Sequence, residues 1–110
     1  MKVDLYFKDC LVGQLSEENG KYNFVLNKEN YEKVKSFPSV MFAFEVEKLV
    51  EGEYDSVPKF FINEFVSNIK QREDIKQKAQ IDILDSDMTV LYKFAALNQI
   101  DFKFHLKQGE

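Results

Sequence analysis

Few side chains in this sequence are of the types that carry out acid–base or nucleophilic chemistry. The chain has a single cysteine, Cys10, and a single histidine, His105. Cys10 is expected in a turn near Lys8, whose charge favours the thiolate, but a cysteine nucleophile also needs a base beside it. Only a fold that brings His105 across the sheet to Cys10 would supply that base. A zinc site would need further cysteine or histidine ligands, which the sequence lacks.

The acidic residues and glycines do not form a catalytic or phosphate-binding pattern either. Asp82, Asp85 and Asp87 are the one tight acidic cluster, and their spacing is similar to the start of a calcium loop. The glycine and the terminal glutamate of that loop are missing, so the cluster indicates the capped start of a helix. The four glycines are isolated at positions 13, 20, 52 and 109, which excludes a phosphate-binding glycine loop. We therefore expect a non-enzymatic chain without cofactor or metal.

Composition predicts one folded domain over residues 1–110. The chain is 45% hydrophobic and 31% charged, which is typical of a globular protein with one core. A formal net charge of -4 argues against direct binding to nucleic acid, which requires a basic surface. The single cysteine, the lack of a signal peptide and the lack of an apolar run of about 20 residues predict a cytoplasmic protein that does not enter a membrane.

Period-two alternation of apolar residues predicts a small antiparallel sheet. The expected strands are residues 3–7, 11–15, 21–26, 40–46 and 100–106. The first three form a meander, with Asn19-Gly20 as a tight turn between the second and the third. The run from Val40 to Val46 is almost wholly apolar and rich in strand formers, so it is expected to be a fourth, well-buried strand. The closing strand is expected to return to the meander, with His105 facing solvent.

About three helices are expected to pack with this sheet, which gives an α+β fold. The main helix is expected in the stretch that begins at Val57, with Asp55 or Ser56 as its cap and Pro58 in its first turn. Its apolar residues recur at four-residue steps and form one wide stripe. Two further helices are expected at residues 71–80 and 87–98, the second capped by Asp85 or Ser86, and residues 27–35 are expected to form at most one helical turn.

Two groups of short motifs occur in a definite order along the chain. The first group is Val12-Gly13-Gln14-Leu15 followed by Asn19-Gly20-Lys21-Tyr22-Asn23-Phe24. The second is Val57-Pro58-Lys59-Phe60-Phe61-Ile62-Asn63, then Arg72, then Met88-Thr89-Val90-Leu91-Tyr92 before the closing strand. In this order the motifs resemble the N-terminal subdomain of HipA-type toxin kinases. That resemblance covers most of the chain.

The sequence departs from the family pattern directly after Asn63. The leucine pair and proline of the family motif are replaced by Glu64, Phe65 and Val66, and the acidic–small pair that follows is replaced by Ser67-Asn68. Without the proline, the main helix is expected to run further than in the family. The ATP-binding and catalytic segments of the kinase have no counterpart in these residues, so none of its catalytic residues is carried over.

A free-standing chain of this kind is similar to the HipS-type proteins of split systems, in which a separate protein supplies the subdomain that the kinase toxin lacks. The resemblance implies an antitoxin-like regulator that binds and inhibits a HipA- or HipT-type serine/threonine kinase. It also implies a helix-turn-helix DNA-binding protein of the HipB type as a further component. We expect the contact at the end of the main helix, where the sequence leaves the family pattern and mixes an aromatic with polar groups. The expected partner-binding residues are Glu64, Phe65, Ser67, Asn68 and Arg72.

Three alternatives stay open from the sequence. By its spacing with Phe61 and Ile69, Phe65 is equally explained as a core residue. The chain is alternatively a supporting, non-inhibitory subunit of the same kinase, since inhibition and support can use one interface. It is alternatively a small ligand-binding or enzymatic domain unrelated to such kinases, with Cys10 or His105 in its site.

Overall fold

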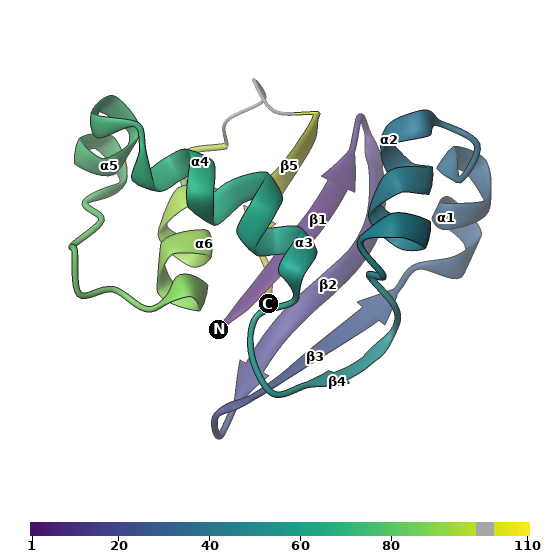
Figure 1. Ribbon diagram of the computed structural model, residues 1–110, viewed down its shortest axis with the longest axis horizontal. Coiled ribbons are helices and arrows are strands. Elements are labelled where there is room, and N and C mark those ends of the chain that lie inside the picture. Colours follow the sequence, from purple (N-terminus) through teal and green to yellow (C-terminus); the bar gives the residue numbers. More distant parts are fainter. Residues whose placement is uncertain (99–102) are drawn as a thin grey trace.

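A computed structural model describes residues 1–98 and 103–110 as an α+β fold built on a five-stranded sheet (Figure 1). The strands are β1 (Lys2–Phe7), β2 (Cys10–Glu18), β3 (Lys21–Leu26), β4 (Gly52–Tyr54) and β5 (Phe104–Gln108). The α-helices are α1 (Lys28–Val34), α2 (Pro38–Met41), α3 (Lys59–Phe61), α4 (Ser67–Lys70), α5 (Glu73–Ala79) and α6 (Asp87–Ala95). Two π-helical segments, η1 (Phe42–Val46) and η2 (Ile62–Val66), continue α2 and α3.

The sheet has the strand order β4-β3-β2-β1-β5, and every neighbouring pair is antiparallel. The expected meander is confirmed, with Val3, Leu5 and Phe7 buried in alternation along β1. The β2–β3 turn places both Asn19 and Gly20 at positive φ, as a two-residue hairpin turn requires. The closing strand is also confirmed, because β5 pairs with β1 through Phe104 and Leu106. The predicted strand positions Ile100 and Phe102 lie outside the described residues.

A close approach between neighbouring strands explains the glycine at position 13. A Cβ atom built on Gly13 would lie 2.5 Å from the Phe24 ring and 2.6 Å from the Val25 carbonyl oxygen, and the second of these is rigid backbone. A side chain at position 13 would therefore displace β3. The missing side chain lets the Phe24 ring lie over β2 and contact Phe61 edge-on, with 6.0 Å between ring centroids.

The main helix runs without a break from Lys59 to Lys70 as α3, η2 and α4, and it crosses one face of the sheet (Figure 1). The π-helical turn in its middle has a physical reason in the sequence. In a π-helical turn, residues five positions apart lie above one another. Phe60 therefore lies above Phe65 and Phe61 above Val66, so two adjacent residues of each turn face the core. All four are buried, and the expected apolar stripe is thereby confirmed and widened.

The predicted start of the main helix is wrong. Its N-cap residue is Pro58, with ψ of 144°, and no side chain caps it. Asp55 is exposed and pairs instead with Lys21 of β3 at 3.1 Å. Pro58 has an extended backbone, so the helix begins one residue later, at Lys59. Because proline has no backbone N–H, one fewer donor at this helix end needs a hydrogen-bond acceptor.

The predicted strand at residues 40–46 is also wrong, because this segment is helical as α2 and η1. Phe37 is the N-cap, with extended backbone, and Pro38 takes the first helical position. Val40 and Ala43 face the core at a three-residue spacing, while Phe44 packs on Tyr31 of α1 with 4.8 Å between ring centroids. The segment therefore buries only one side, and its other side faces solvent.

Helices α1 and α6 each begin at a residue whose side chain caps them. Asn27 accepts a hydrogen bond from the Asn30 backbone N–H, so residues 28–34 form a full helix rather than a single turn. Ser86 caps α6 by accepting from the Thr89 N–H, which confirms one of the two predicted caps. Helices α5 and α6 are both shorter than predicted, with α5 beginning at Glu73 and α6 ending at Ala95. No helix in the described part of the chain is long and apolar enough to cross a membrane.

Candidate protein-binding surface

The structure keeps the two reactive side chains apart. Cys10 pairs with Phe7 across β1 and β2, whereas His105 pairs with Tyr6 across β1 and β5. The two residues therefore lie on strands that flank β1 on opposite sides, and strand spacing puts their backbones about 9–10 Å apart. His105 stacks on the Tyr6 ring with 5.4 Å between centroids. This arrangement does not form a cysteine–histidine dyad.

The surroundings of His105 also favour its neutral form. Partial burial, and next the charge of Lys107, lower the pKa of the imidazole, while Asp9 opposes this shift. The ring serves to cover Tyr6 on the face of the sheet that the main helix leaves open. Within residues 1–98 and 103–110, no three acidic, cysteine or histidine side chains gather closely enough to hold a metal ion.

The sequence-predicted contact residues lie on both sides of the main helix. Phe65 is fully buried and contacts three other phenylalanine rings, so it is part of the core. Ser67 and Asn68 are exposed, and Asn68 donates to the Glu64 carbonyl one turn earlier. Arg72 is exposed and pairs with Asp74 at 3.0 Å. Glu64 is half-buried and faces the neighbouring helix η1.

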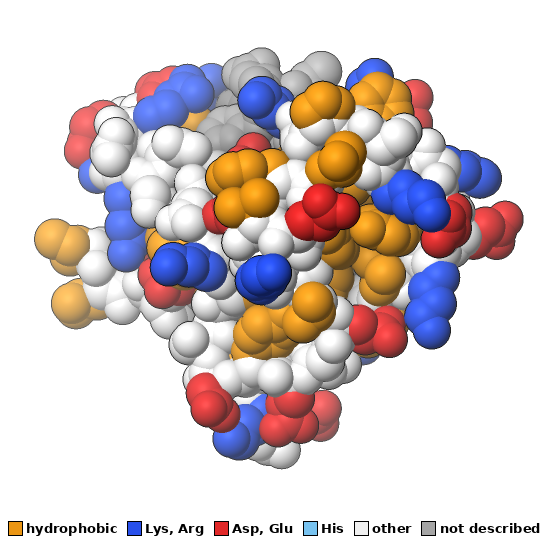
Figure 2. All heavy atoms as spheres, turned by 45° about the vertical axis from the view of Figure 1, so that its right-hand side comes forward, with side chains coloured by type: hydrophobic (Ala, Val, Ile, Leu, Met, Phe, Trp, Pro, Cys, Tyr) orange, Lys and Arg blue, Asp and Glu red, His pale blue; other side chains and the backbone are white. Residues whose placement is uncertain are grey.

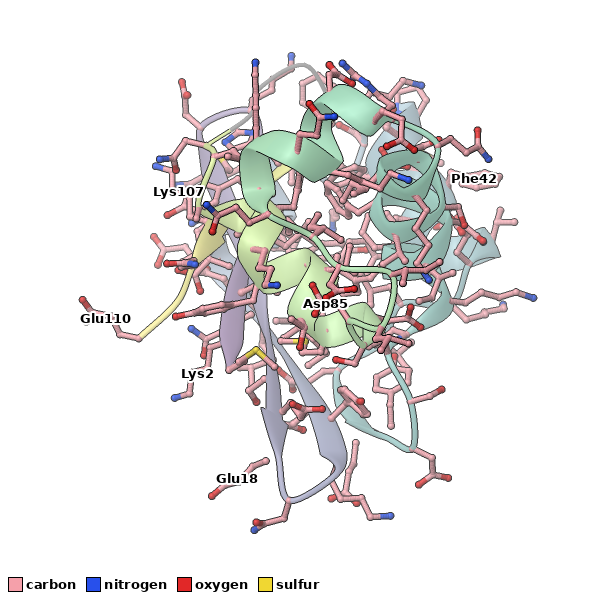
Figure 3. All side chains as sticks on the ribbon, turned by 90° about the vertical axis from the view of Figure 1, so that its left-hand side faces the viewer. Lys2, Glu18, Phe42, Asp85, Lys107 and Glu110 are labelled. Atoms are coloured by element: carbon pink, nitrogen blue, oxygen red, sulfur yellow. The ribbon has the colours of Figure 1, made fainter. Side chains whose placement is uncertain are left out.

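An apolar strip on the outer side of α2 and η1 is the feature that the sequence analysis missed. Phe42 exposes 54% of its surface and Val46 exposes 62%. Two more exposed apolar residues precede them, which completes what we call the α2–η1 strip: Phe37, Met41, Phe42 and Val46. Figure 2 shows hydrophobic side chains gathered on the face that carries this segment, and Figure 3 shows the labelled Phe42 at the edge of the molecule. Single exposed apolar residues are ordinary, but four on one short helix indicate a contact surface.

Cation–π contact fixes one end of the strip. The Lys8 ammonium lies 4.3 Å from the centroid of the Phe37 ring, and the same ring packs on Phe7 at 5.2 Å. The aromatic side chain is thus held against the β1–β2 turn while part of it stays exposed. A surface that is already ordered costs little conformational entropy when a partner binds.

A groove of about 360 Å³ runs between the strip and the main helix. Its lining residues are Pro38, Ser39, Phe42, Glu47, Phe60, Glu64, Lys103 and Phe104. The floor is aromatic, because Phe60 and Phe104 lie edge to face with 5.0 Å between centroids. Two carboxylates and one ammonium stand at the rim, and the Glu47 carboxylate accepts a hydrogen bond from Asn63 at 2.9 Å. A long cationic side chain of a partner fits this combination of apolar floor and acidic rim.

The Glu64 carboxyl is the one groove residue with a clear shift in its acidity. Its burial, and next the negative charge of Glu47, raise the pKa of Glu64 above its usual value, while Lys103 opposes the shift. The native state therefore holds this proton to a higher pH than the unfolded chain does. Stability falls as the pH rises from the ordinary glutamate pKa through the raised one, and it stays lower above that window.

Glu64→Gln is accordingly expected to raise the free energy of unfolding at pH 7, because the amide removes a poorly solvated charge next to Glu47. The gain should disappear at about pH 3, where the carboxyl is protonated in both states. Urea denaturation at the two pH values measures it, with Glu53→Gln on the exposed edge strand β4 as the matched control. A destabilised Glu64→Gln variant at pH 7 would show that the carboxylate is stabilised by its surroundings instead.

A signal for the strip was present in the sequence. Pro38 is well suited to the first position of a helix, and Val40 and Ala43 are three residues apart, as on one helical face. The run from Val40 to Val46 is nevertheless apolar at almost every position, so periodicity alone cannot separate a buried strand from a helix with an apolar outer side.

Comparison of this chain with protein-family models, with curated proteins and with solved structures finds no match in any of the three. Its function is therefore inferred from the surface described above and from the sequence motifs.

Proposed function

We propose that this chain is an antitoxin-like regulatory protein that binds and inhibits a HipA- or HipT-type serine/threonine kinase, with the α2–η1 strip as its main contact. The exposure of the strip carries the proposal, since Phe42 and Val46 are more than half exposed. The motifs around Gly13 and Asn63 supply the class of partner by resemblance. A cytoplasmic location and a helix-turn-helix DNA-binding protein as a third component belong to the same proposal.

The anchor of the interface would be Phe42. Aromatic side chains and methionine are enriched at the centres of protein interfaces. Phe42 belongs both to the exposed strip and to the lining of the groove. A lysine or arginine of the kinase would enter the groove and face Glu47 and Glu64. Its cationic head would also stabilise the ionised form of Glu64 and so relieve the cost that burial imposes on this carboxylate.

Inhibition follows if the chain binds an inactive conformation of the kinase more tightly than the active one. A ligand shifts a conformational equilibrium only as far as its affinities for the two states differ. The opposite preference would make the chain a supporting subunit that uses the same strip. The side chains of the strip do not distinguish these two outcomes, but growth of cells that express the kinase does.

The test is co-expression with a HipA-type kinase that lacks its own N-terminal subdomain. We expect the kinase alone to arrest growth and the wild-type chain to restore it, whereas the exposed-site variant Val46→Asp should restore growth poorly. Toxicity that appears only when the chain is present would assign the supporting role. Growth arrest that the chain leaves unchanged, with no complex recovered from the cells, would contradict both roles.

A further inference from the structure

A second apolar surface lies in the loop between α5 and α6, far from the strip. Ile83 exposes 96% and Leu84 exposes 89% of its surface, the two highest values among the large apolar residues that the structure describes. In Figure 1 this loop lies at the left end of the longest axis, whereas α1 and α2 lie at the right end. A partner on the α2–η1 strip would therefore leave these two residues in solvent.

The loop is ordered by its own hydrogen bonds. The Asp82 N–H donates to the Asp85 carboxylate at 2.9 Å, and the Leu84 N–H donates to the Asp82 carboxylate at 3.3 Å. Lys93 of α6 then donates to the Asp85 carboxylate at 2.6 Å and to the Gln80 carbonyl at 3.0 Å. The lysine contacts also lower the pKa of Asp85, so this carboxylate stays ionised and holds the loop. Leu84 is presented outward from a fixed turn rather than from a loose one.

A groove lies directly beside the projecting leucine. It has a volume of about 520 Å³ and is lined by Lys70, Glu73, Lys76, Gln77, Gln80, Ile81, Asp82 and Ile83. We call it the α5 groove. Ile81 and Ile83 give the lining its apolar part, to which Lys70 and Lys76 add their aliphatic stems. Leu84 follows the lining residue Ile83 directly in the chain, so a projecting aliphatic side chain stands next to a groove that has room for one.

The charges around the two features are complementary. Asp82, which lines the groove where it meets the loop, forms no ion pair with any residue in the described ranges. Lys70, on the groove side, is 54% exposed and reaches its intrachain partner Asp87 only at 3.5 Å. A second loop with the same residues could place its leucine in the groove and the carboxylate of its Asp82 beside Lys70.

We propose that the occupant of the α5 groove is a second copy of this chain, with Leu84 of each copy in the groove of the other and Asp82 facing Lys70 across a two-fold axis. Because Leu84 is adjacent to the groove of its own chain, both contacts repeat across one two-fold axis and the assembly closes. The surface is small, so the dimer is weak and forms at high concentration. The dimer leaves the α2–η1 strip free on each copy.

A membrane surface is a poorer occupant for the same loop. The carboxylate of Asp82 stands beside the two apolar side chains without an ion pair in the described ranges, and anionic lipid headgroups repel its charge. Vesicles therefore enter the test as the competing explanation.

The test is the mass of the full chain in solution by sedimentation velocity from about 10 µM to about 1 mM, a range that covers weak association. We expect the wild type to rise from 13.0 kDa towards twice that mass. Leu84→Asp is expected to remain monomeric over the whole range, and its fold should be intact because residue 84 is exposed. The control Val46→Asp on the α2–η1 strip should associate like the wild type.

A second pair of variants tests the charge contact. Lys70→Glu is expected to weaken self-association at least about tenfold, whereas Lys78→Glu, with the same charge change on α5 outside the groove, should not. A wild-type chain that stays monomeric at every concentration overturns the proposal, as does a Leu84→Asp variant that associates normally. Binding of the monomer to phosphatidylglycerol vesicles through Leu84, without self-association, overturns it in favour of the membrane.

Discussion

Phe65→Ala is expected to lower the free energy of unfolding by about 3–5 kcal/mol, the usual cost of removing a phenylalanine from a well-packed core. The side chain is fully buried, and its ring centroid lies within 6.3 Å of Phe60, 6.4 Å of Phe61 and 6.1 Å of Phe94. Phe94 belongs to α6, while Phe60 and Phe61 belong to the main helix and contact Phe104 of β5 and Phe24 of β3 in turn. The cavity left by alanine would therefore open at the junction of three elements. Urea denaturation followed by circular dichroism measures the loss.

The matched control is Ser67→Ala, two residues further along the same helix and exposed. It should change the free energy of unfolding by less than about 0.5 kcal/mol. A Phe65→Ala variant that loses less than about 1 kcal/mol would mean that the ring does not fill the core as described. Comparing the two variants also distinguishes a packing role of Phe65 from a binding role. A kinase-binding defect in Phe65→Ala would arise from the damaged core rather than from a lost contact with the kinase.

Phe42→Asp is expected to weaken binding to the kinase at least about 30-fold, which corresponds to the 2 kcal/mol or more that anchor residues contribute to an interface. The change places a charge where the proposed partner surface is apolar, and it adds a third carboxylate near Glu47 and Glu64. Phe42 is more than half exposed, so the free energy of unfolding should change little. Isothermal titration calorimetry with the purified kinase measures the affinity.

The control for this variant is Val25→Asp, an exposed apolar position on β3 away from the strip. It introduces the same charge and should leave the affinity unchanged. Equal loss of affinity in both variants would indicate a general effect of charge, and unchanged affinity for Phe42→Asp in a folded protein would remove the strip from the interface.

Strands β1, β2, β3 and β5 could be predicted from the sequence because their pattern is local, whereas the sequence indicates only a connection where β4 forms. Alternation at Val3, Leu5 and Phe7 and the Asn19-Gly20 turn each determine a short piece of backbone with no help from the rest of the chain. The same is true of Ser86, whose hydroxyl caps α6 three residues before Thr89. Where a residue's own conformational preference decides the structure, the prediction agrees with the fold.

The errors occur where the local pattern allows more than one structure. Asp55 is a good helix cap by type, but the helix begins only after Pro58, and the exposed Asp55 carboxylate lies beside Lys21. Residues 40–46 fit a strand by composition, and the packing of Val40, Ala43 and Phe44 against other elements favours the helix that Pro38 allows. The π-helical turn at residues 62–66 likewise arises because two pairs of adjacent side chains both find room in the core.

Of the residues that the sequence suggests for partner binding, Glu64 lies in the groove beside the strip, and its role in binding stays a prediction. A strand at residues 40–46 would place Phe42 and Val46 in the interior, whereas the helix exposes both. A wrong secondary structure therefore hides the exposed apolar strip, since the two sides of a helix and of a strand expose different residues.

The most direct measurement is the rate at which a purified HipA-type kinase lacking its own N-terminal subdomain phosphorylates its substrate as this chain is added. We predict that the rate falls with increasing chain and levels off at one chain per kinase, and that Phe42→Asp shifts the curve to higher concentration. A rate that stays constant at a large excess of the folded wild-type chain, with no complex formed, would contradict the proposed function.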